Sequence, residues 1–182
     1  MASDLVTEVA ESLAAMAHLP YMGEPVDQRA HALQAAGFAL AAGADDELVV
    51  ATLLHDIARV SGDGSTPHAR AGAEWCGSRF SDRVAWLVGA HVSAKRYLVA
   101  TDPSYGDDLT GASQESLRHQ GGPFTPTEAA QFAGHPWAAD AVRLRRWDDA
   151  AKVPGAPEPE EAVVLQLVAA VGAPPTARRS PE

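Results

Sequence analysis

The chain has 182 residues, 46% of them hydrophobic, and a formal net charge of -10 at neutral pH. This length suffices for one domain with a buried core and leaves little for a second domain. The negative charge opposes a polyanionic partner such as nucleic acid, and the single cysteine, Cys76, excludes an internal disulfide and a cysteine-rich zinc site.

The start of the chain indicates neither export nor membrane insertion. The first residues lack the basic start and apolar core of a signal peptide, and no apolar run approaches the roughly 20 residues of a membrane span. We therefore expect a cytoplasmic protein without a membrane partner.

Helical segments separated by Gly, Pro and Asp or Ser residues make up the chain, and no sustained period-2 alternation indicates strands. We expect an all-α fold in which residues 1–182 form one domain, with a core at about 20–155, a C-terminal helix at about 160–171 and a loose tail at 176–182. The clearest local signal is the capping box TPTE at 125–128. Helices are expected at about 3–18, 27–43, 45–56, 67–80, 81–91, from 126 onward, 136–150 and 160–171, with a polar loop at 61–66.

A histidine and an aspartate, His55 and Asp56, stand side by side near the end of an apolar helix. Burying a charge or an unpaired imidazole in such a run is costly unless something compensates, and a metal ion would do so. A carboxylate has two oxygens and can link two ions. The pair therefore suggests that further ligands stand elsewhere in the chain.

Other polar residues recur on apolar helix faces. His31 shares a stripe with Ala35, Phe38 and Ala42, and we expect it to point toward the core. The inward-facing candidates, from five expected helices, are His31, His55, His68, His91 and Asp148. Any one of them could be an ordinary hydrogen-bonded core residue. Together with Asp56 they favour a metal site, because helical bundles build such sites from inward carboxylates and histidines.

The order of these residues resembles the HD-domain superfamily in its two-metal form, named for the adjacent His-Asp pair. Further blocks are similar to the mixed-valent di-iron oxygenases of that superfamily, the PhnZ and TmpB type. These blocks are YMGE at 21–24, GAD at 43–45, HVSAKRYL at 91–98, QGGP at 120–123 and RRWD at 145–148. The similarity covers about residues 20–155 and implies an HD-domain helical bundle with a dinuclear metal site in its core.

The resemblance also implies a ligand set and a cofactor. It makes His31, His55 and Asp148 the terminal ligands of one iron and gives His68 and His91 to the second. Asp56 bridges the two. The cofactor would be two iron ions in the mixed-valent Fe2+/Fe3+ state, with O2 as co-substrate, although histidine and carboxylate ligands also hold manganese or zinc.

A small anionic phosphonate is the substrate class that the resemblance implies. The positions matching its contacts are Lys95, Arg145, Ser113 and Gln120. They could instead be surface charges, a helix cap and a turn residue. Arg59 is also expected to bind the substrate, because its planar fork of donors suits an oxyanion, although the family has a histidine there. This departure favours an N-methylated substrate. The alternative is that Arg59 is a surface residue on a helix end.

Two residues before the first ligand, Tyr21 and Glu24, match a gate in the family. There the tyrosine occupies a position on the first iron until a substrate ammonium pairs with the glutamate. A loop plug and a solvated acid are the structural alternatives.

The expected reaction is oxidative cleavage of the carbon-phosphorus bond of a 1-hydroxy-2-aminoethylphosphonate-type compound, or its N-methylated analogue, releasing phosphate and glycine or glycine betaine. Two alternatives remain open. One is a metal-dependent HD-domain phosphohydrolase acting on a phosphate ester with metal-bound hydroxide. The other is a regulatory binding domain, which the complete ligand set argues against.

Overall fold

The computed structural model describes residues 2–21, 23–61 and 66–172. Over these residues the chain is all-helical, as predicted, and Pro20 and Asp27 form an isolated β-bridge. The predicted tail at 176–182 and residues 62–65 of the predicted polar loop lie outside the described part. No described helix is both long and apolar enough to span a bilayer. The helices are α1 (Ala2–Met16), α2 (Gln28–Ala41), α3 (Asp46–Leu54), α4 (Ala58–Ser61), α5 (His68–Gly77), α6 (Asp82–Thr101), α7 (Pro103–Asp107), α8 (Gly111–His119), α9 (Pro126–Ala133), α10 (Ala138–Ala150) and α11 (Glu161–Val171).

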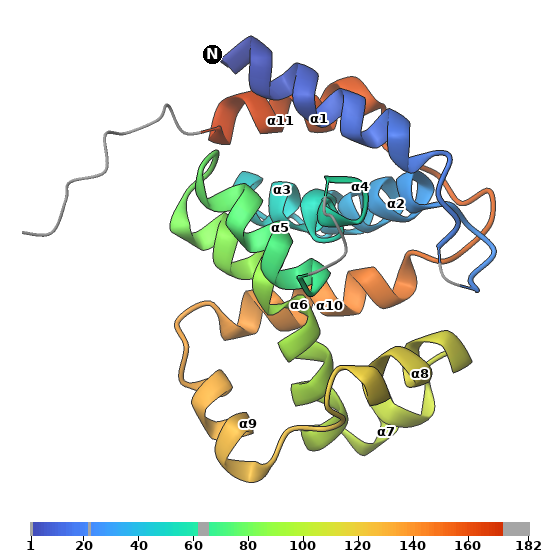
Figure 1. Cartoon of the computed structure of the whole chain (residues 1–182), viewed down its shortest axis with the longest axis vertical. Helices are drawn as coiled ribbons and strands as arrows, with labels where there is room; N and C mark the ends of the chain where they lie inside the picture. Colours follow the sequence, from blue (N-terminus) through green and yellow to red (C-terminus); the bar gives the residue numbers. More distant parts are fainter. Residues whose placement is uncertain (1, 22, 62–65, 173–182) are drawn as a thin grey trace, which may run out of the picture.

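Helices α1 and α11 lie side by side at one end of the molecule, over a central group formed by α2, α3, α5 and α6 (Figure 1). Helix α10 packs against α2, α3 and α6. The long helix α6 continues past this group toward the end where α7, α8 and α9 lie. The main core lies between α1, α11 and the central helices, and its fully buried members include Leu13, Leu33, Leu48, Leu54, Leu87, Leu144 and Val164.

Side-chain caps fix several helix starts where the sequence predicts them. The carboxylates of Asp27 and Asp45 and the hydroxyl of Ser81 each accept a hydrogen bond from the backbone N–H three residues on. Thr125 and Glu128 form both halves of the predicted capping box. Each cap satisfies a backbone donor that has no partner within the helix, which explains why these local signals predict well.

The ends of some helices differ from the prediction. Helix α3 stops at Leu54, so His55 and Asp56 lie in the turn that follows it and not within the helix. The Ile57 N–H bonds to the Leu54 carbonyl at 3.0 Å, an i to i+3 contact that tightens the chain before α4 begins at Ala58. This turn lets two adjacent side chains reach the same buried region.

Helices α5 and α6 also begin or end at residues other than those predicted. Pro67 is the N-cap of α5 and not its first residue, and α5 ends at Gly77, before Phe80. Helix α6 continues ten residues beyond His91 to Thr101, because no glycine or proline interrupts the chain there. The short helices α7 and α8 were not predicted, since few of their residues are apolar and buried.

The apolar stripe expected through His31 is only partly correct. His31 and Ala35 are buried, but Phe38 is 38% exposed and Ala42 is exposed. The buried face of α2 passes through Ala39 instead. Intervals of four, seven and eleven residues keep to one helix face, so the face itself leaves the core toward the end of α2, where Phe38 and Ala42 are exposed.

Glycines allow α5 and α6 to cross closely. A Cβ atom at Gly72 would lie 2.9 Å from the Val88 side chain, and one at Gly89 would lie 3.0 Å from the Cβ atom of Ala73. Neither glycine has a side chain to hold the helices apart. The close crossing brings the start of α5, with His68, beside the middle of α6, with His91.

Candidate metal centre

Six side chains converge in the interior, and five of them form two overlapping groups. They are His31, His55, Asp56, His68, His91 and Asp148. One group contains His31, His55 and Asp56, the other Asp56, His68 and His91, and within each the potential ligand atoms lie within 4.8 Å of one another. Asp148 adjoins the first group, with its Oδ1 atom 3.4 Å from Nε2 of His31.

The hydrogen bonds of the first two histidines leave one nitrogen of each ring for a cation. Nδ1 of His31 lies 2.7 Å from the Ala151 carbonyl, and Nδ1 of His55 lies 2.7 Å from that of Thr52. A carbonyl only accepts, so both Nδ1 atoms donate and both Nε2 atoms carry a lone pair in the neutral rings. These Nε2 atoms face each other at 3.1 Å.

The second pair repeats this arrangement. Nδ1 of His91 donates to the Val88 carbonyl at 2.7 Å, and its Nε2 lies 3.1 Å from Nε2 of His68. Ligands about 2.1 Å from a common ion lie about 3 Å apart when they are adjacent, so both spacings fit metal coordination. Carbonyl groups that hold the distal ring nitrogen of a ligand are a usual support in metal sites.

Asp56 stands between the two groups. Its Oδ2 atom is 3.7 Å from Nε2 of His55, while its Oδ1 atom is 3.3 Å from Nε2 of His68 and 3.8 Å from that of His91. Oδ1 is buried and accepts no hydrogen bond from the described residues. A buried carboxylate oxygen that faces two imidazoles and lacks a hydrogen-bond donor fits a metal ligand.

Asp148 is held by a buried ion-pair network. Nη1 of Arg145 donates to its Oδ2 at 2.7 Å, and Nε of Arg145 lies 3.0 Å from the Tyr105 hydroxyl. Arg145 also pairs closely with Asp149, to which Tyr105 donates a short hydrogen bond. Burial would raise the pKa of Asp148, but Arg145, together with His55 and His31, outweighs it and holds this pKa well below the usual range. Asp148 is therefore an oriented anion.

The ionisation of the other ligands also suits a cation. Burial raises the pKa of Asp56, yet its interactions with His55, Arg59, His68 and His91 together more than offset this, so the carboxylate is ionised. Burial lowers the pKa of His68, and it lowers that of His91 well below the ordinary value. Neutral imidazoles beside ionised carboxylates are the protonation states that metal binding requires.

Tyr21 lies against the first group, where the sequence places it. Its ring stacks on that of His31 with centroids 3.8 Å apart, and its hydroxyl donates to Oδ1 of Asp148 at 3.2 Å. Burial, followed by the charge of Asp148, raises the pKa of the phenol well above its ordinary value. The protonated hydroxyl thus covers one side of the first group.

Glu24 lies farther out and is engaged by two other side chains. Its Oε1 atom accepts a hydrogen bond from the Thr110 hydroxyl at 2.5 Å and lies 3.6 Å from Nζ of Lys152. Glu24 lines a small cavity together with Tyr21 and Arg59. The glutamate is therefore near the site but already has a cationic partner.

A cavity of about 40 Å³ adjoins the candidate metal ligands. All four predicted phosphonate contacts line it, namely Lys95, Arg145, Ser113 and Gln120. This volume holds only a few water molecules. The structure thus brings together the residues that the sequence predicts for an anion, in a space for a compact ligand.

Lys95 and Gln120 carry polar groups that remain available in this cavity. Nζ of Lys95 donates to the Ser116 hydroxyl at 2.6 Å, and the side chain is buried. Burial, and after it the charge of Arg145, lowers the pKa of Lys95 to about 8. Oε1 of Gln120 is buried without a hydrogen-bond partner among the described residues. Both groups can serve a ligand without first losing an ion pair.

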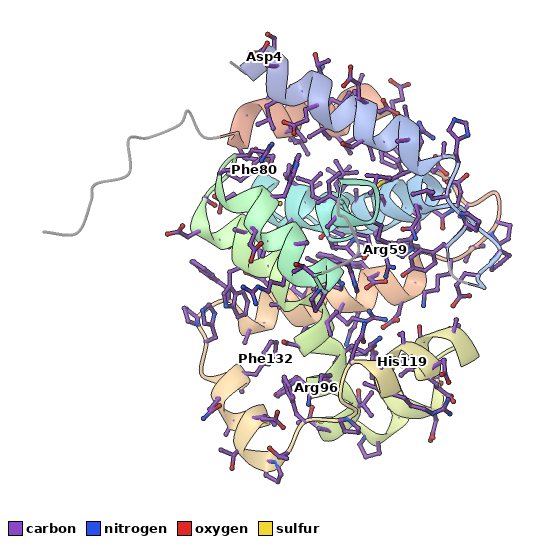
Figure 2. The ribbon with its side chains drawn as sticks, in the orientation of Figure 1. Asp4, Arg59, Phe80, Arg96, His119 and Phe132 are labelled. Carbon is purple, nitrogen blue, oxygen red and sulfur yellow. The ribbon has the colours of Figure 1, made fainter. Side chains whose placement is uncertain are left out.

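Arg59 belongs to the site and is not a free surface side chain. Its Nε atom lies 2.9 Å from Oδ2 of Asp56 and its Nη2 lies 3.5 Å from Nε2 of His68. Figure 2 shows Arg59 beside the central helices, whereas His119 lies on α8. His119 pairs with Glu115 and is 78% exposed.

The sequence prediction missed Lys152. Its ammonium lies 2.8 Å from the Ser113 hydroxyl and 3.5 Å from Oδ1 of Asp149, and it sits 5.9 Å over the Tyr21 ring. Lys152 stands four residues after Asp148, one helical turn on, and that spacing could have pointed to it. Helix α10 ends at Ala150, so Lys152 lies beyond the residues whose position on a helix face can be predicted from their spacing.

Two of the known proteins similar to this chain are named as phosphonate dioxygenases. The chain is 39% identical over 150 residues to hydroxymethylphosphonate dioxygenase of Gimesia maris. This alignment covers 77% of this chain and 75% of that protein. It is 38% identical over 141 residues to the glycine-betaine-forming [1-hydroxy-2-(trimethylamino)ethyl]phosphonate dioxygenase of Leisingera caerulea, covering 72% of each. It is also 30% identical over 144 residues to an uncharacterized protein of Acanthamoeba polyphaga mimivirus, covering 73% of this chain and 66% of that protein.

No protein-family model matches the chain. The two dioxygenases nevertheless align with most of its length at well over 30% identity. Their names agree in the oxygenase reaction and the phosphonate substrate and differ in the group attached to the phosphonate. The histidine and aspartate groups of this chain fit the metal site that such a reaction uses. The chain therefore belongs to the phosphonate dioxygenase family and is an oxygenase.

Proposed function

We propose that this protein is an HD-domain di-iron oxygenase that uses O2 to cleave the carbon-phosphorus bond of a 1-hydroxyphosphonate. The observation that carries the proposal is Asp56, which faces a histidine group with each of its two oxygens. His31, His55 and Asp148 would hold one iron. His68 and His91 would hold the other, and Asp56 would bridge them. Residues 1–182 would form one such domain, with its core at about 20–155.

The overall reaction balances without another reductant. A 1-hydroxyphosphonate and O2 give a carboxylic acid and phosphoric acid, so the products contain two more oxygen atoms than the organic substrate. One is on the new carboxyl group and one on phosphate. The broken C–H and C–P bonds supply the four electrons that reduce O2. The bound irons would supply the electron transfer and oxygen activation that amino-acid side chains lack.

The protein groups would bind and orient the phosphonate. Lys95 contacts the Ser116 hydroxyl and, among the described residues, no carboxylate, so its charge is available for a dianion. Ser113 and Gln120 offer further hydrogen bonds from the same cavity. Arg145 lines the cavity too, but its contacts with Asp148 and Asp149 also make it a positioning residue for the first metal.

Tyr21 would act as a gate. Its hydroxyl already contacts Asp148, and its ring stacks on His31, so it covers the first metal position from the side of the small cavity that Glu24 lines. Movement of Tyr21 on substrate binding would expose that position. A ligand that interacts better with the open arrangement shifts the population toward it.

Phosphorus NMR and dissolved-oxygen measurements on the iron-loaded protein test the function. With hydroxymethylphosphonate in air we expect one phosphate released for each O2 consumed, and no release without O2. The zinc-loaded protein should be inactive on this substrate. Release of phosphate from a phosphate ester by the zinc form, with no oxygen uptake, would support the metal-dependent phosphohydrolase instead.

A further inference from the structure

We propose that Lys152 is a specificity residue that occupies the cation position beside Glu24 and restricts this enzyme to phosphonates without a positively charged substituent. The inference rests on the proposed function and narrows its substrate class. It bears on the amino and N-methylated substrates that the sequence resemblance implies, because those compounds need a carboxylate that is free to pair with their nitrogen.

The ammonium of Lys152 is buried at the boundary of the site. Its side chain is 8% exposed, and its Nζ atom lies 2.8 Å from the Ser113 hydroxyl and 3.6 Å from Oε1 of Glu24. Ser113 lines both small cavities of about 40 Å³ beside the metal ligands. The Lys152 charge is therefore one side chain away from the space where the substrate would bind.

Glu24 already faces a cation. One of its oxygens accepts a hydrogen bond from Thr110 at 2.5 Å and also faces Lys152. A substrate ammonium at this carboxylate would have to displace the lysine or approach it closely. Like charges held close together in a partly buried site repel strongly.

The other cationic side chains around the two small cavities also repel a positively charged substituent of the substrate. Arg59, Lys95 and Arg145 line the cavity beside the metal ligands, and Lys152 adds a fourth cation at its edge. Among the described residues that line these two cavities, Glu24 is the carboxylate outside the metal ligands, and Lys152 contacts both Glu24 and the neighbouring Asp149. The site therefore attracts a dianionic phosphonate and offers no unpaired acid, among these contacts, to a cationic tail.

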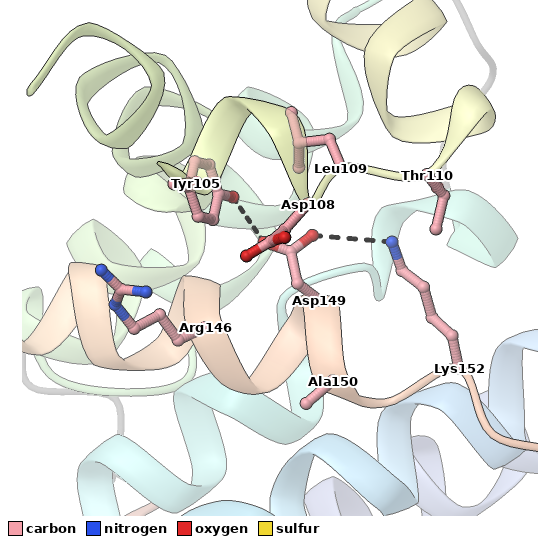
Figure 3. Close-up of a pocket in the computed structure, with 8 residues that line it drawn as sticks. All are labelled: Tyr105, Asp108, Leu109, Thr110, Arg146, Asp149, Ala150 and Lys152. Carbon is pink, nitrogen blue, oxygen red and sulfur yellow. Dashed lines mark hydrogen bonds and ion pairs between the residues drawn. The ribbon is translucent and has the colours of Figure 1, made fainter. Parts of the chain in front are cut away.

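Lys152 also borders a larger cavity, of about 290 Å³, that contains none of the metal ligands (Figure 3). The ion pair between Lys152 and Asp149 is drawn there, and Arg146 lines the same cavity. Arg146 instead pairs with Asp102 at 3.0 Å and is 53% exposed. The variant Arg146→Met therefore removes a cation from the same neighbourhood without touching Glu24, which makes it a matched control for Lys152→Met.

The experiment compares two hydroxyphosphonates. Phosphate release by the iron-loaded enzyme is measured with hydroxymethylphosphonate, which has no cation, and with [1-hydroxy-2-(trimethylamino)ethyl]phosphonate. Anaerobic titration calorimetry measures binding of both. We expect the wild type to favour the first compound in kcat/KM by at least about tenfold, and Lys152→Met to shift this ratio at least about tenfold toward the second. Lys152→Arg and Arg146→Met should keep the wild-type ratio.

The possible outcomes test the role of Lys152 separately from the proposed oxygenase function. Equal or better use of the trimethylated compound by the wild type overturns the role of Lys152, whether or not Lys152→Met folds. An unchanged ratio in folded Lys152→Met also overturns it. If no variant releases phosphate from either compound, the proposed function fails. The calorimetric preference then still decides whether Lys152 excludes cations.

Discussion

The Nε2 atoms of His31 and His55 face each other at 3.1 Å while both Nδ1 atoms donate to backbone carbonyls. Two lone pairs at this distance repel unless a cation lies beside them, so metal binding should stabilise the fold. Chelation should lower the Tm by about 5 to 10 °C, from the usual gain at saturating ligand for a chain of this size. Differential scanning calorimetry of metal-free and iron-loaded protein measures this. The exposed variant His119→Ala should show the same difference, and equal Tm values in both forms would contradict the metal site.

The two aspartates should differ in how many ions their loss releases. Asp56→Ala removes the carboxylate shared by both groups, so the protein should retain one metal ion or none. Asp148→Ala affects the first group alone and should spare the second ion. Elemental analysis of purified variants gives the metal content. Full retention of two ions in both variants would refute the ligand assignment.

Substrate binding should weaken at alkaline pH because of Lys95. Its pKa is lowered to about 8 by burial and by the charge of Arg145, so the ammonium is present below this pH and lost above it. The KM for a hydroxyphosphonate should therefore rise between pH 7 and 9, with kcat changing less. Lys95→Met should raise the KM at pH 7 by about tenfold or more and flatten its pH dependence, since a charge-assisted contact is lost. A wild-type KM constant across this range would show that Lys95 does not bind the phosphonate.

Tyr21→Phe should make the first metal more reactive toward oxygen. The change removes the hydroxyl that donates to Asp148 and keeps the ring that stacks on His31. Without substrate, the mixed-valent electron paramagnetic resonance signal should disappear faster in air than in the wild type. Tyr105→Phe, which removes a hydroxyl beside Arg145 and Asp149, serves for comparison. Decay of Tyr21→Phe at the wild-type rate would argue against the gate.

The close crossing of α5 and α6 should tolerate no side chain at Gly72. An alanine there would bring its Cβ within 2.9 Å of the buried Val88 side chain, so Gly72→Ala should lower the free energy of unfolding by about 1 to 3 kcal/mol. At Gly77 the nearest atom would be 3.9 Å away, and Gly77→Ala should be neutral or slightly stabilising. Urea unfolding of the two variants measures the difference. Equal stability would show that α5 and α6 can separate without cost.

Interactions between residues that are near in the sequence explain why the helix starts and the candidate metal ligands could be predicted without the structure. A cap such as Asp27 or Thr125 acts on a backbone group three residues away, so its effect is contained in the sequence nearby. The candidate ligands stood out because His31, His91 and Asp148 interrupt apolar helix faces. Burying such polar groups is costly, and binding a common metal ion would compensate for the burial of several of them at one place.

The tertiary structure alone decided which charges meet. Lys152 reaches Glu24 across 128 positions of the chain, and Arg145 reaches Tyr105 across 40. No local pattern marks these contacts, because they depend on how α10 packs against α2 and α6 and on where the chain turns after α10 ends. Local sequence patterns predicted the all-α fold and singled out the histidines and aspartates that the structure brings together in the core. The packing of distant helices determined that Glu24 meets an internal cation, since ion pairs of this kind form only where the fold brings their charges into the same buried space.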